Sequence, residues 1–99
     1  MAAQYDLFQL PDGPLVVILQ SDLLDQLSTR VVAPLLPKAS LGRVMDSLNP
    51  VVTIGEELHL IMPQLVATLR VTELGQRVGS LAWMRDEITR AMDALLSGI

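Results

Sequence analysis

The apolar run Leu15–Leu19 sets the strongest limit on what this chain can fold into. Five apolar residues, three of them β-branched, follow the turn residues of Leu10–Pro14 and precede the polar Gln20. Such a run is typical of a strand that is buried on both faces, and it is too short to cross a bilayer. In the turn, proline presets φ and the Asp-Gly pair tolerates the positions that follow. We therefore predict a hairpin, whose first strand comes from the loosely alternating residues 4–8.

Further strands are predicted through the middle of the chain. The β-branched run Val31–Leu36 predicts a strand, and Pro34 places it at a sheet edge or a bulge because proline cannot donate a ladder hydrogen bond. Residues 37–49 fit a short helix or a long loop with one helical turn equally well. Residues 50–62 predict a hairpin around a glycine-containing turn, and residues 66–72 predict one more strand.

The end of the chain has a different pattern. From Leu81 onward an apolar stripe recurs at helical spacing, and Ser80 precedes it as an N-cap. The stripe consists of Leu81, Met84, Ile88, Ala91, Met92 and Leu95. We predict an amphipathic C-terminal helix that ends at Gly98, because glycine readily adopts the left-handed C-cap conformation. Ile99 then either folds back onto the last turn or projects as an apolar hook with a free carboxylate.

Length, composition and charge narrow the class of protein. Ninety-nine residues, half of them apolar, predict one globular domain (residues 1–99) that we expect to self-associate. The absence of cysteine fits a reducing cytoplasm, and the acidic segment MAAQYDLFQL does not resemble a secretion signal. The net charge is −4 and the seven bases are dispersed, so we expect a protein partner and no direct contact with nucleic acid or membrane. A basic patch that only the fold assembles stays open.

No residue pattern predicts a catalytic, metal or cofactor site. His59 is expected to face solvent from a strand, and Glu56–Glu57 forms a charged hairpin tip rather than a catalytic pair. Asp22 and Asp25 are too few to bind a metal ion and are better explained by turns and caps. No nucleophile, phosphate-loop or zinc-protease motif is present, so we predict that the chain is not an enzyme and holds no cofactor. Trp83 either anchors an interface or packs into its own domain.

Three segments of the sequence resemble one protein family. They are QSDLLDQLSTRVVAPLLP at residues 20–37, LNPVVTIGEELHLIM at residues 48–62, and the closing helix that ends in Gly-Ile. In this order they resemble CcdB, a plasmid-addiction toxin, over nearly the whole chain. The resemblance implies a small antiparallel barrel of SH3-like type, as in Kid and MazF toxins, with a long C-terminal helix. It also implies a homodimer that is not an enzyme, that inhibits DNA gyrase through its A subunit, and that a CcdA-like antitoxin neutralises.

The resemblance implies two sets of binding residues. The gyrase-facing set comprises Leu23, Leu24, Asp93, Leu96, Ser97, Gly98 and Ile99. The antitoxin-facing set comprises Leu10, Pro11, Asp12, Gly13, Leu41, Gly42 and Arg43. Neither set implies a catalytic residue or a metal ligand.

Ser97 departs from the family pattern, in which the toxin ends in Trp-Gly-Ile and the tryptophan stacks on an arginine of gyrase. Truncating a tryptophan at the centre of an interface costs about 2 kcal/mol or more. Three interpretations of Ser97 follow: weaker gyrase binding, a different gyrase as target, or loss of poisoning with the fold retained. Two other functions stay open, an endoribonuclease of the Kid/MazF type and a non-toxic relative that only binds antitoxin.

Overall fold

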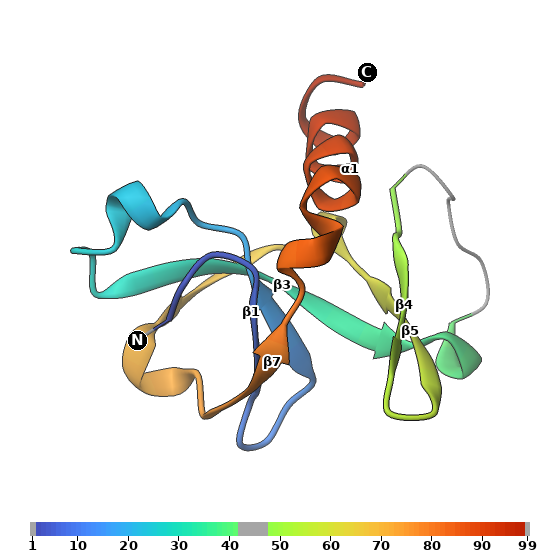
Figure 1. Ribbon diagram of the computed structural model, residues 1–99, viewed down its shortest axis with the longest axis horizontal. Coiled ribbons are helices and arrows are strands. Elements are labelled where there is room, and N and C mark those ends of the chain that lie inside the picture. Colours follow the sequence, from blue (N-terminus) through green and yellow to red (C-terminus); the bar gives the residue numbers. More distant parts are fainter. Residues whose placement is uncertain (1, 42–47, 99) are drawn as a thin grey trace.

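The structure, a computed structural model, describes residues 2–41 and 48–98. Within these residues the chain forms seven strands, several short 3₁₀ turns and one α-helix (Figure 1). The elements are β1 (Asp6–Gln9), β2 (Leu15–Ile18), β3 (Thr29–Pro37), β4 (Val51–Ile54), β5 (Glu57–Ile61), β6 (Ala67–Arg70), β7 (Gln76–Ser80) and α1 (Arg85–Ser97). The predicted fold class, mainly antiparallel β with a C-terminal helix, is confirmed.

Strand β3 organises the sheet. All strand pairings are antiparallel, in the order β4-β5-β3-β2-β1-β7, and β6 is an additional partner of β3. One edge of β3 pairs with β2, while the opposite edge pairs with β6 over Thr29–Val32 and with β5 over Leu35–Pro37. Because two strands diverge from the same edge, the sheet cannot stay flat and curls into a half-barrel (Figure 1).

Pro34 lies in the interior of the sheet, so the prediction of an edge or bulge position is wrong. Pro34 is paired with Val16 of β2, but its carbonyl accepts a hydrogen bond of 2.9 Å from the Met62 N–H, on the side away from β2. On that side, the pairing with β6 ends at Val32 and the pairing with β5 starts at Leu35. The missing N–H of proline therefore falls where the ladder is already interrupted.

The two predicted hairpins are confirmed, although the first strand, expected at residues 4–8, is β1 (Asp6–Gln9), because the left-handed Tyr5 interrupts an extended backbone. Residues 10–14 connect β1 to β2, and Gly55-Glu56 connects β4 to β5. The strand predicted at residues 66–72 is shorter than expected, because a 3₁₀ turn at Val71–Glu73 follows β6. For residues 37–49, where the sequence fits a short helix or a loop with one helical turn, the structure describes a 3₁₀ turn at Lys38–Ser40. Residues 42–47 lie outside the described residues.

Strand β7 was not predicted from the sequence. It carries one large apolar residue, Val78, and that side chain is half exposed, so no apolar pattern marks the strand. β7 pairs with β1 across a bulge, and Arg77 Nε lies 3.2 Å from Oδ2 of the buried Asp6. Tertiary pairing and this ion pair, rather than local patterning, place β7 in the sheet.

Apolar side chains pack on both faces of the sheet. One cluster comprises Leu7, Val17, Ala33, Leu35, Val52, Ile61, Leu81, Met84 and Ile88. The other comprises Ala2, Phe8, Val16, Ile18, Val32 and Leu74. Successive residues of β2 contribute to alternate clusters, as the pleat of a strand requires. The prediction that Leu15–Leu19 forms a strand buried on both faces is confirmed for its central residues.

The C-terminal helix begins later than predicted. Ser80 still belongs to β7, and its Oγ accepts a hydrogen bond of 3.1 Å from the Ala82 N–H at the start of a 3₁₀ turn. The α-helix follows at Arg85, and the predicted apolar stripe is buried or half-buried along its length. Figure 1 shows α1 rising from the sheet with its C-terminal end pointing away from it. Among the described residues, no helix is long and apolar enough to span a membrane.

Gly75 and Gly55 have similar backbone conformations, but only Gly75 is closely approached by other atoms. Comparing their substitutions therefore distinguishes the cost of backbone strain from the cost of steric overlap. Both have positive φ, 77° and 65° respectively. A Cβ atom on Gly75 would overlap the carbonyl oxygen of Gln9 and lie 3.1 Å from Pro11 Cδ, whereas one on Gly55 would meet nothing within 4 Å. We expect Gly55→Ala to lower the free energy of unfolding by about 1–2 kcal/mol. We expect Gly75→Ala to lower it by about 1–3 kcal/mol more, because β1 must shift. Urea denaturation measures both, and equal losses would contradict the close approach.

Candidate functional site

The segment Ser21–Ser28, which we name the leucine loop, exposes three leucines between β2 and β3. Leu23 is 92% exposed, and Leu24 and Leu27 are about half exposed. Single exposed apolar side chains are common, but a group of them on one segment marks an interaction surface. Leu23 and Leu24 are also the loop residues that the resemblance assigns to gyrase binding.

Polar contacts hold the start of the leucine loop. Ser21 Oγ accepts a hydrogen bond of 3.1 Å from the Leu23 N–H and so caps a 3₁₀ turn at Asp22–Leu24. Asp22 Oδ1 accepts a hydrogen bond of 2.7 Å from the Gln4 N–H. Asp22 therefore has a structural role in a turn. In the part of the chain that the structure describes, no group of three or more metal-ligating side chains occurs.

Gln20 closes the base of the leucine loop. Its Nε2 donates to the carbonyl oxygens of Leu24 and Thr29 at 3.2 and 3.1 Å, and its Oε1 accepts from the Val31 N–H at 3.1 Å. The side-chain amide at the start of the loop thus binds both the middle of the loop and the first residues of β3 that follow it. The sequence gives no sign of this role, because glutamine is common on exposed surfaces.

Arg30 binds two carbonyl groups of the loop and two outside it. The side chain is 4% exposed, and Nε donates to Ala2 O at 3.1 Å. Nη1 donates to Leu27 O (2.6 Å) and Thr29 O (2.9 Å), and Nη2 donates to Asp25 O (3.2 Å). A buried charge is tolerated when hydrogen bonds satisfy its donors, and the planar guanidinium supplies several donors in fixed directions. Arg30 is therefore an internal clamp on the leucine loop rather than a free cation.

The C-terminal end of α1 presents a second exposed apolar group. Leu96 is 76% exposed, and Asp93, Ser97 and Gly98 are exposed around it. Ser97 Oγ donates to the Asp93 carbonyl at 2.8 Å, so the hydroxyl is occupied within its own helix. Gly98 has φ 73°, and its N–H donates to a carbonyl of the last turn, which confirms the predicted C-cap. Ile99 lies outside the described residues.

The described residues that the resemblance assigns to gyrase binding form two groups, which do not contact each other within one chain. Figure 1 shows the leucine loop and the C-terminal end of α1 on the same side of the sheet but well apart. A partner that contacts both must therefore span the surface between them.

The described residues of the set that the resemblance assigns to antitoxin binding lie elsewhere. The Leu10–Gly13 turn joins β1 to β2 at the end of the molecule opposite to the tip of α1, and Leu41 follows the 3₁₀ turn at Lys38–Ser40 (Figure 1). The turn is exposed except for the half-buried Leu10, and Gln9 Nε2 donates to the carbonyls of Leu10 and Gly13 at 3.2 and 2.8 Å. Gly42 and Arg43 lie outside the described residues.

His59 is buried, so the prediction that it faces solvent is wrong. It is 8% exposed, lies opposite Pro37 of β3 and Val52 of β4, and its Nδ1 is 3.2 Å from the Glu57 carbonyl oxygen. The sequence pattern does not show which side faces solvent, because leucine flanks the histidine on both sides and the exposed leucine is Leu58. Glu56 is exposed at the hairpin tip, as predicted.

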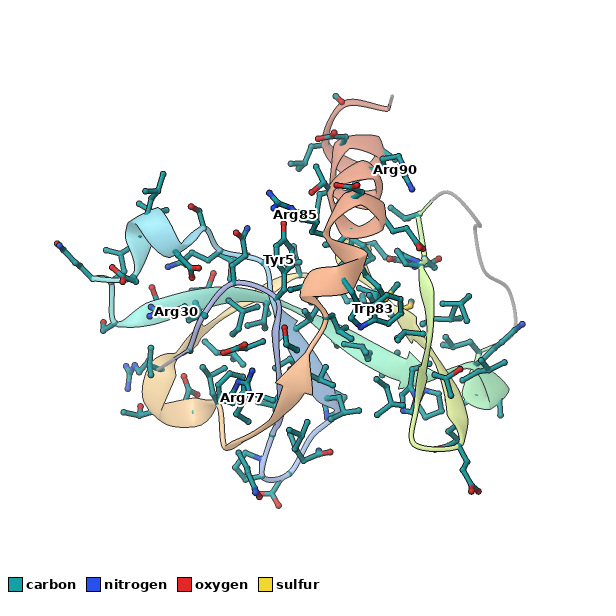
Figure 2. All side chains as sticks on the ribbon, viewed as in Figure 1. Tyr5, Arg30, Arg77, Trp83, Arg85 and Arg90 are labelled. Atoms are coloured by element: carbon teal, nitrogen blue, oxygen red, sulfur yellow. The ribbon has the colours of Figure 1, made fainter. Side chains whose placement is uncertain are left out.

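The four arginines labelled in Figure 2 do not gather on one surface. Arg30 is bound to carbonyls and Arg77 to Asp6, and Figure 2 shows Arg85 and Arg90 leaving α1 in different directions. Trp83, by contrast, is 72% exposed beside the root of α1, toward the β4–β5 hairpin (Figure 2). Of the two interpretations of Trp83, the exposed side chain favours an interface anchor.

A comparison with family models supplies the family. The model described as CcdB protein matches residues 4–98. The chain belongs to the CcdB family. The match covers nearly the whole chain and confirms the resemblance found in the sequence.

Three solved structures share the fold. An endoribonuclease in complex with its cognate antitoxin, from mycobacterial species, is 13% identical with a TM-score of 0.77 and covers 97% of this chain and 95% of its own. A further mycobacterial endoribonuclease gives the same identity and TM-score, with 95% and 89% covered. The Mycobacterium tuberculosis toxin MazF-mt6 is 20% identical with a TM-score of 0.62, with 89% and 90% covered. These matches confirm the predicted barrel type.

The same comparison overturns the prediction that the chain is not an enzyme. Two of these structures are named as endoribonucleases, so this fold carries RNA cleavage in other proteins. The prediction relied on missing linear motifs, but a fold can assemble a catalytic site from residues far apart in the sequence. The family and the structural neighbours together support a toxin of a toxin–antitoxin system.

Replacing Arg30 by lysine tests the clamp. Lysine keeps the charge but lacks the planar fork, and each lost hydrogen bond from a charged group costs about 1.5–3 kcal/mol. We expect Arg30→Lys to lower the free energy of unfolding by about 2–3 kcal/mol and to accelerate amide exchange at Leu24, Asp25 and Leu27. Arg90→Lys on the exposed face of α1 is the control, with an expected change within about 0.5 kcal/mol. Equal effects of the two substitutions would contradict the clamp.

Proposed function

We propose that this chain is the toxin of a type II toxin–antitoxin pair and that it inhibits DNA gyrase by binding the A subunit. In this proposal it acts in the cytoplasm as a single domain (residues 1–99), assembles as a homodimer, and is neutralised by a CcdA-like antitoxin. Membership of the CcdB family supports the proposal. The four arginines labelled in Figure 2 do not form one basic surface, which favours a protein target over nucleic acid.

The observation that carries the proposal is an exposed leucine on an anchored loop. Leu23 is 92% exposed, although Ser21, Gln20 and Arg30 hold the backbone around it. Binding normally requires loops and side chains to become ordered, which opposes association. A preformed leucine loop avoids most of this cost, so its apolar side chains can contribute their burial energy directly to a complex.

The end of α1 supplies the second contact in the proposed complex. Leu96 is exposed there, and Asp93, Ser97 and Gly98 surround it. Because this group and the leucine loop lie on one side of the sheet, a single large protein can contact both (Figure 1). The Leu10–Gly13 turn lies at the opposite end (Figure 1), so this part of the proposed antitoxin surface is separate from the proposed gyrase surface.

RNA cleavage is a second candidate function, and one observation favours it. The fold is shared with two proteins named as endoribonucleases. Cleavage requires cationic and acid–base side chains that converge on the scissile phosphate. Arg85 and Arg90 are exposed, but they leave α1 in different directions (Figure 2). The experiments below separate this function from gyrase inhibition.

Truncation of the exposed leucines tests the gyrase surface. We expect Leu23→Ala and Leu24→Ala each to weaken binding to the gyrase A subunit about thirtyfold, the effect of losing an interface hot spot of about 2 kcal/mol. Unfolding free energy should change by less than about 0.5 kcal/mol, because these side chains make few internal contacts. Binding, DNA supercoiling by purified gyrase and growth on inducible expression are the three measurements.

Leu58→Ala is the matched control, because Leu58 is about as exposed as Leu24 but lies in β5. It should leave binding unchanged. If the unmodified protein leaves supercoiling and growth untouched, the gyrase proposal fails. Cleavage of purified RNA by that same protein would support the second candidate. If the protein neither cleaves RNA nor affects supercoiling or growth, it is the non-toxic relative that only binds antitoxin.

Restoring the tryptophan tests the role of Ser97. The side chain at this position is exposed, and its hydroxyl bonds only to its own helix, so a larger residue fits without disturbing the core. We expect Ser97→Trp to increase affinity for the gyrase A subunit about thirtyfold and to strengthen growth arrest. Ser97→Ala is the control and should bind as the unmodified protein does. Equal affinity of the tryptophan and alanine variants would show that position 97 does not face gyrase.

A further inference from the structure

We infer that residues Ala2–Tyr5, which we name the N-terminal strap, set the position of the leucine loop relative to α1, with Gln4 and Tyr5 as positioning residues for partner binding. The inference rests on the proposed function, because it assumes that the partner contacts both elements. It adds a device that neither the family match nor the sequence indicates. The strap is the one described segment whose backbone is hydrogen-bonded both to the loop and to the root of α1.

The first half of the strap holds the leucine loop. Ala2 O accepts from Arg30 Nε at 3.1 Å, which ties the strap to the clamp under the loop. The Gln4 N–H donates to Asp22 Oδ1 at 2.7 Å, and Gln4 Nε2 donates to Leu19 O at 3.0 Å. A backbone donor and a side-chain donor of one residue therefore bind the loop and the end of the strand before it.

The second half of the strap holds the root of α1. The Tyr5 N–H donates to Ile18 O at 2.7 Å, and Tyr5 O accepts from the Leu81 N–H at 2.7 Å. Leu81 directly precedes the 3₁₀ turn that leads into α1, so the orientation of the helix root depends on this bond. The half-buried Tyr5 side chain also packs against the core cluster that contains Leu81 and Met84.

Tyr5 has a backbone conformation that a tyrosine rarely adopts. Its φ is 71°, and it is the non-glycine residue with positive φ among the described residues. For a bulky side chain this conformation is strained, and it persists only when surrounding contacts determine it. The reversal at Tyr5 lets its two backbone bonds reach β2 and the helix root, while Gln4 faces the leucine loop. Figure 2 shows the Tyr5 ring between the leucine-loop side of the molecule and α1.

The chain provides its own spectroscopic probe of this geometry. Trp83 is the only tryptophan, it sits in the turn at the root of α1, and the chain has no cysteine. Gln26→Cys places a thiol at an exposed position of the leucine loop for labelling with an acceptor of tryptophan emission. Energy transfer from Trp83 to this label then reports the separation of the two elements in the folded protein.

Two pairs of variants test the strap in this labelled background. Asp22→Ala removes the acceptor of the Gln4 N–H, and Asp25→Ala removes an equal charge from the same loop without touching the strap. Tyr5→Val places a β-branched residue at the positive φ, and Tyr5→Phe keeps the ring and removes only the hydroxyl. We expect Asp22→Ala and Tyr5→Val to change the transfer efficiency and widen its distribution, while Asp25→Ala and Tyr5→Phe match the parent. Binding is measured separately on proteins that keep Gln26 and carry no label, and there we expect Asp22→Ala to weaken binding to the gyrase A subunit about tenfold.

The outcomes separate the strap from the proposed function. If the parent protein does not bind the gyrase A subunit, the proposed function fails, and the transfer measurement still decides whether the strap sets the geometry. Unchanged transfer in a folded Asp22→Ala variant overturns the strap, even if Tyr5→Val fails to fold. Changed transfer with unchanged gyrase binding overturns the role of the strap in recognition.

Discussion

The divided edge of β3 is the constraint on which the rest of this structure depends. β2 occupies one edge of the strand, while β5 and β6 share the other and separate at Pro34. A proline in a continuous central ladder would leave a carbonyl without its donor. Here the residue marks the point where β5 and β6 separate and the sheet curls, with α1 rising from it (Figure 1).

The candidate site, the leucine loop, connects two strands, and hydrogen bonds hold its backbone in one conformation. The leucine loop has no core of its own, so its conformation depends on hydrogen bonds from Gln20, Arg30 and the N-terminal strap. Polar groups inside the protein thus hold an apolar surface in water. Such an arrangement suits a protein that recognises another folded protein, because the loop is ordered before the partner arrives. In the proposed gyrase complex, Ser97 stands where the family pattern has an aromatic anchor, so the leucine loop would supply more of the binding energy.

Much of the fold could be predicted because its signals are local. The β-branched run of β2, the glycine-containing turn of the β4–β5 hairpin and the apolar stripe of α1 each express a preference of neighbouring residues. The errors concern residues whose environment is set at a distance. Pro34 is tolerated because two other strands separate there, His59 is buried by β3 and β4, and the polar β7 is held by β1. The exclusion of catalysis failed for the same reason, since motif spacing describes only neighbours in the chain.

The sequence by itself determined the mainly antiparallel class of the fold, its two hairpins and its C-terminal helix, because these follow from residue types at short spacing. Three of its segments also carry the resemblance to the family. The tertiary structure alone decided that Arg30 is a clamp, that Tyr5 takes a left-handed conformation, and that the leucine loop and the end of α1 share one side of the sheet. These features join segments that are far apart in the sequence, such as Ala2 with Arg30 and Tyr5 with Leu81. Hydrogen bonds of this kind depend on where the sheet places each backbone group, and no local preference records that position.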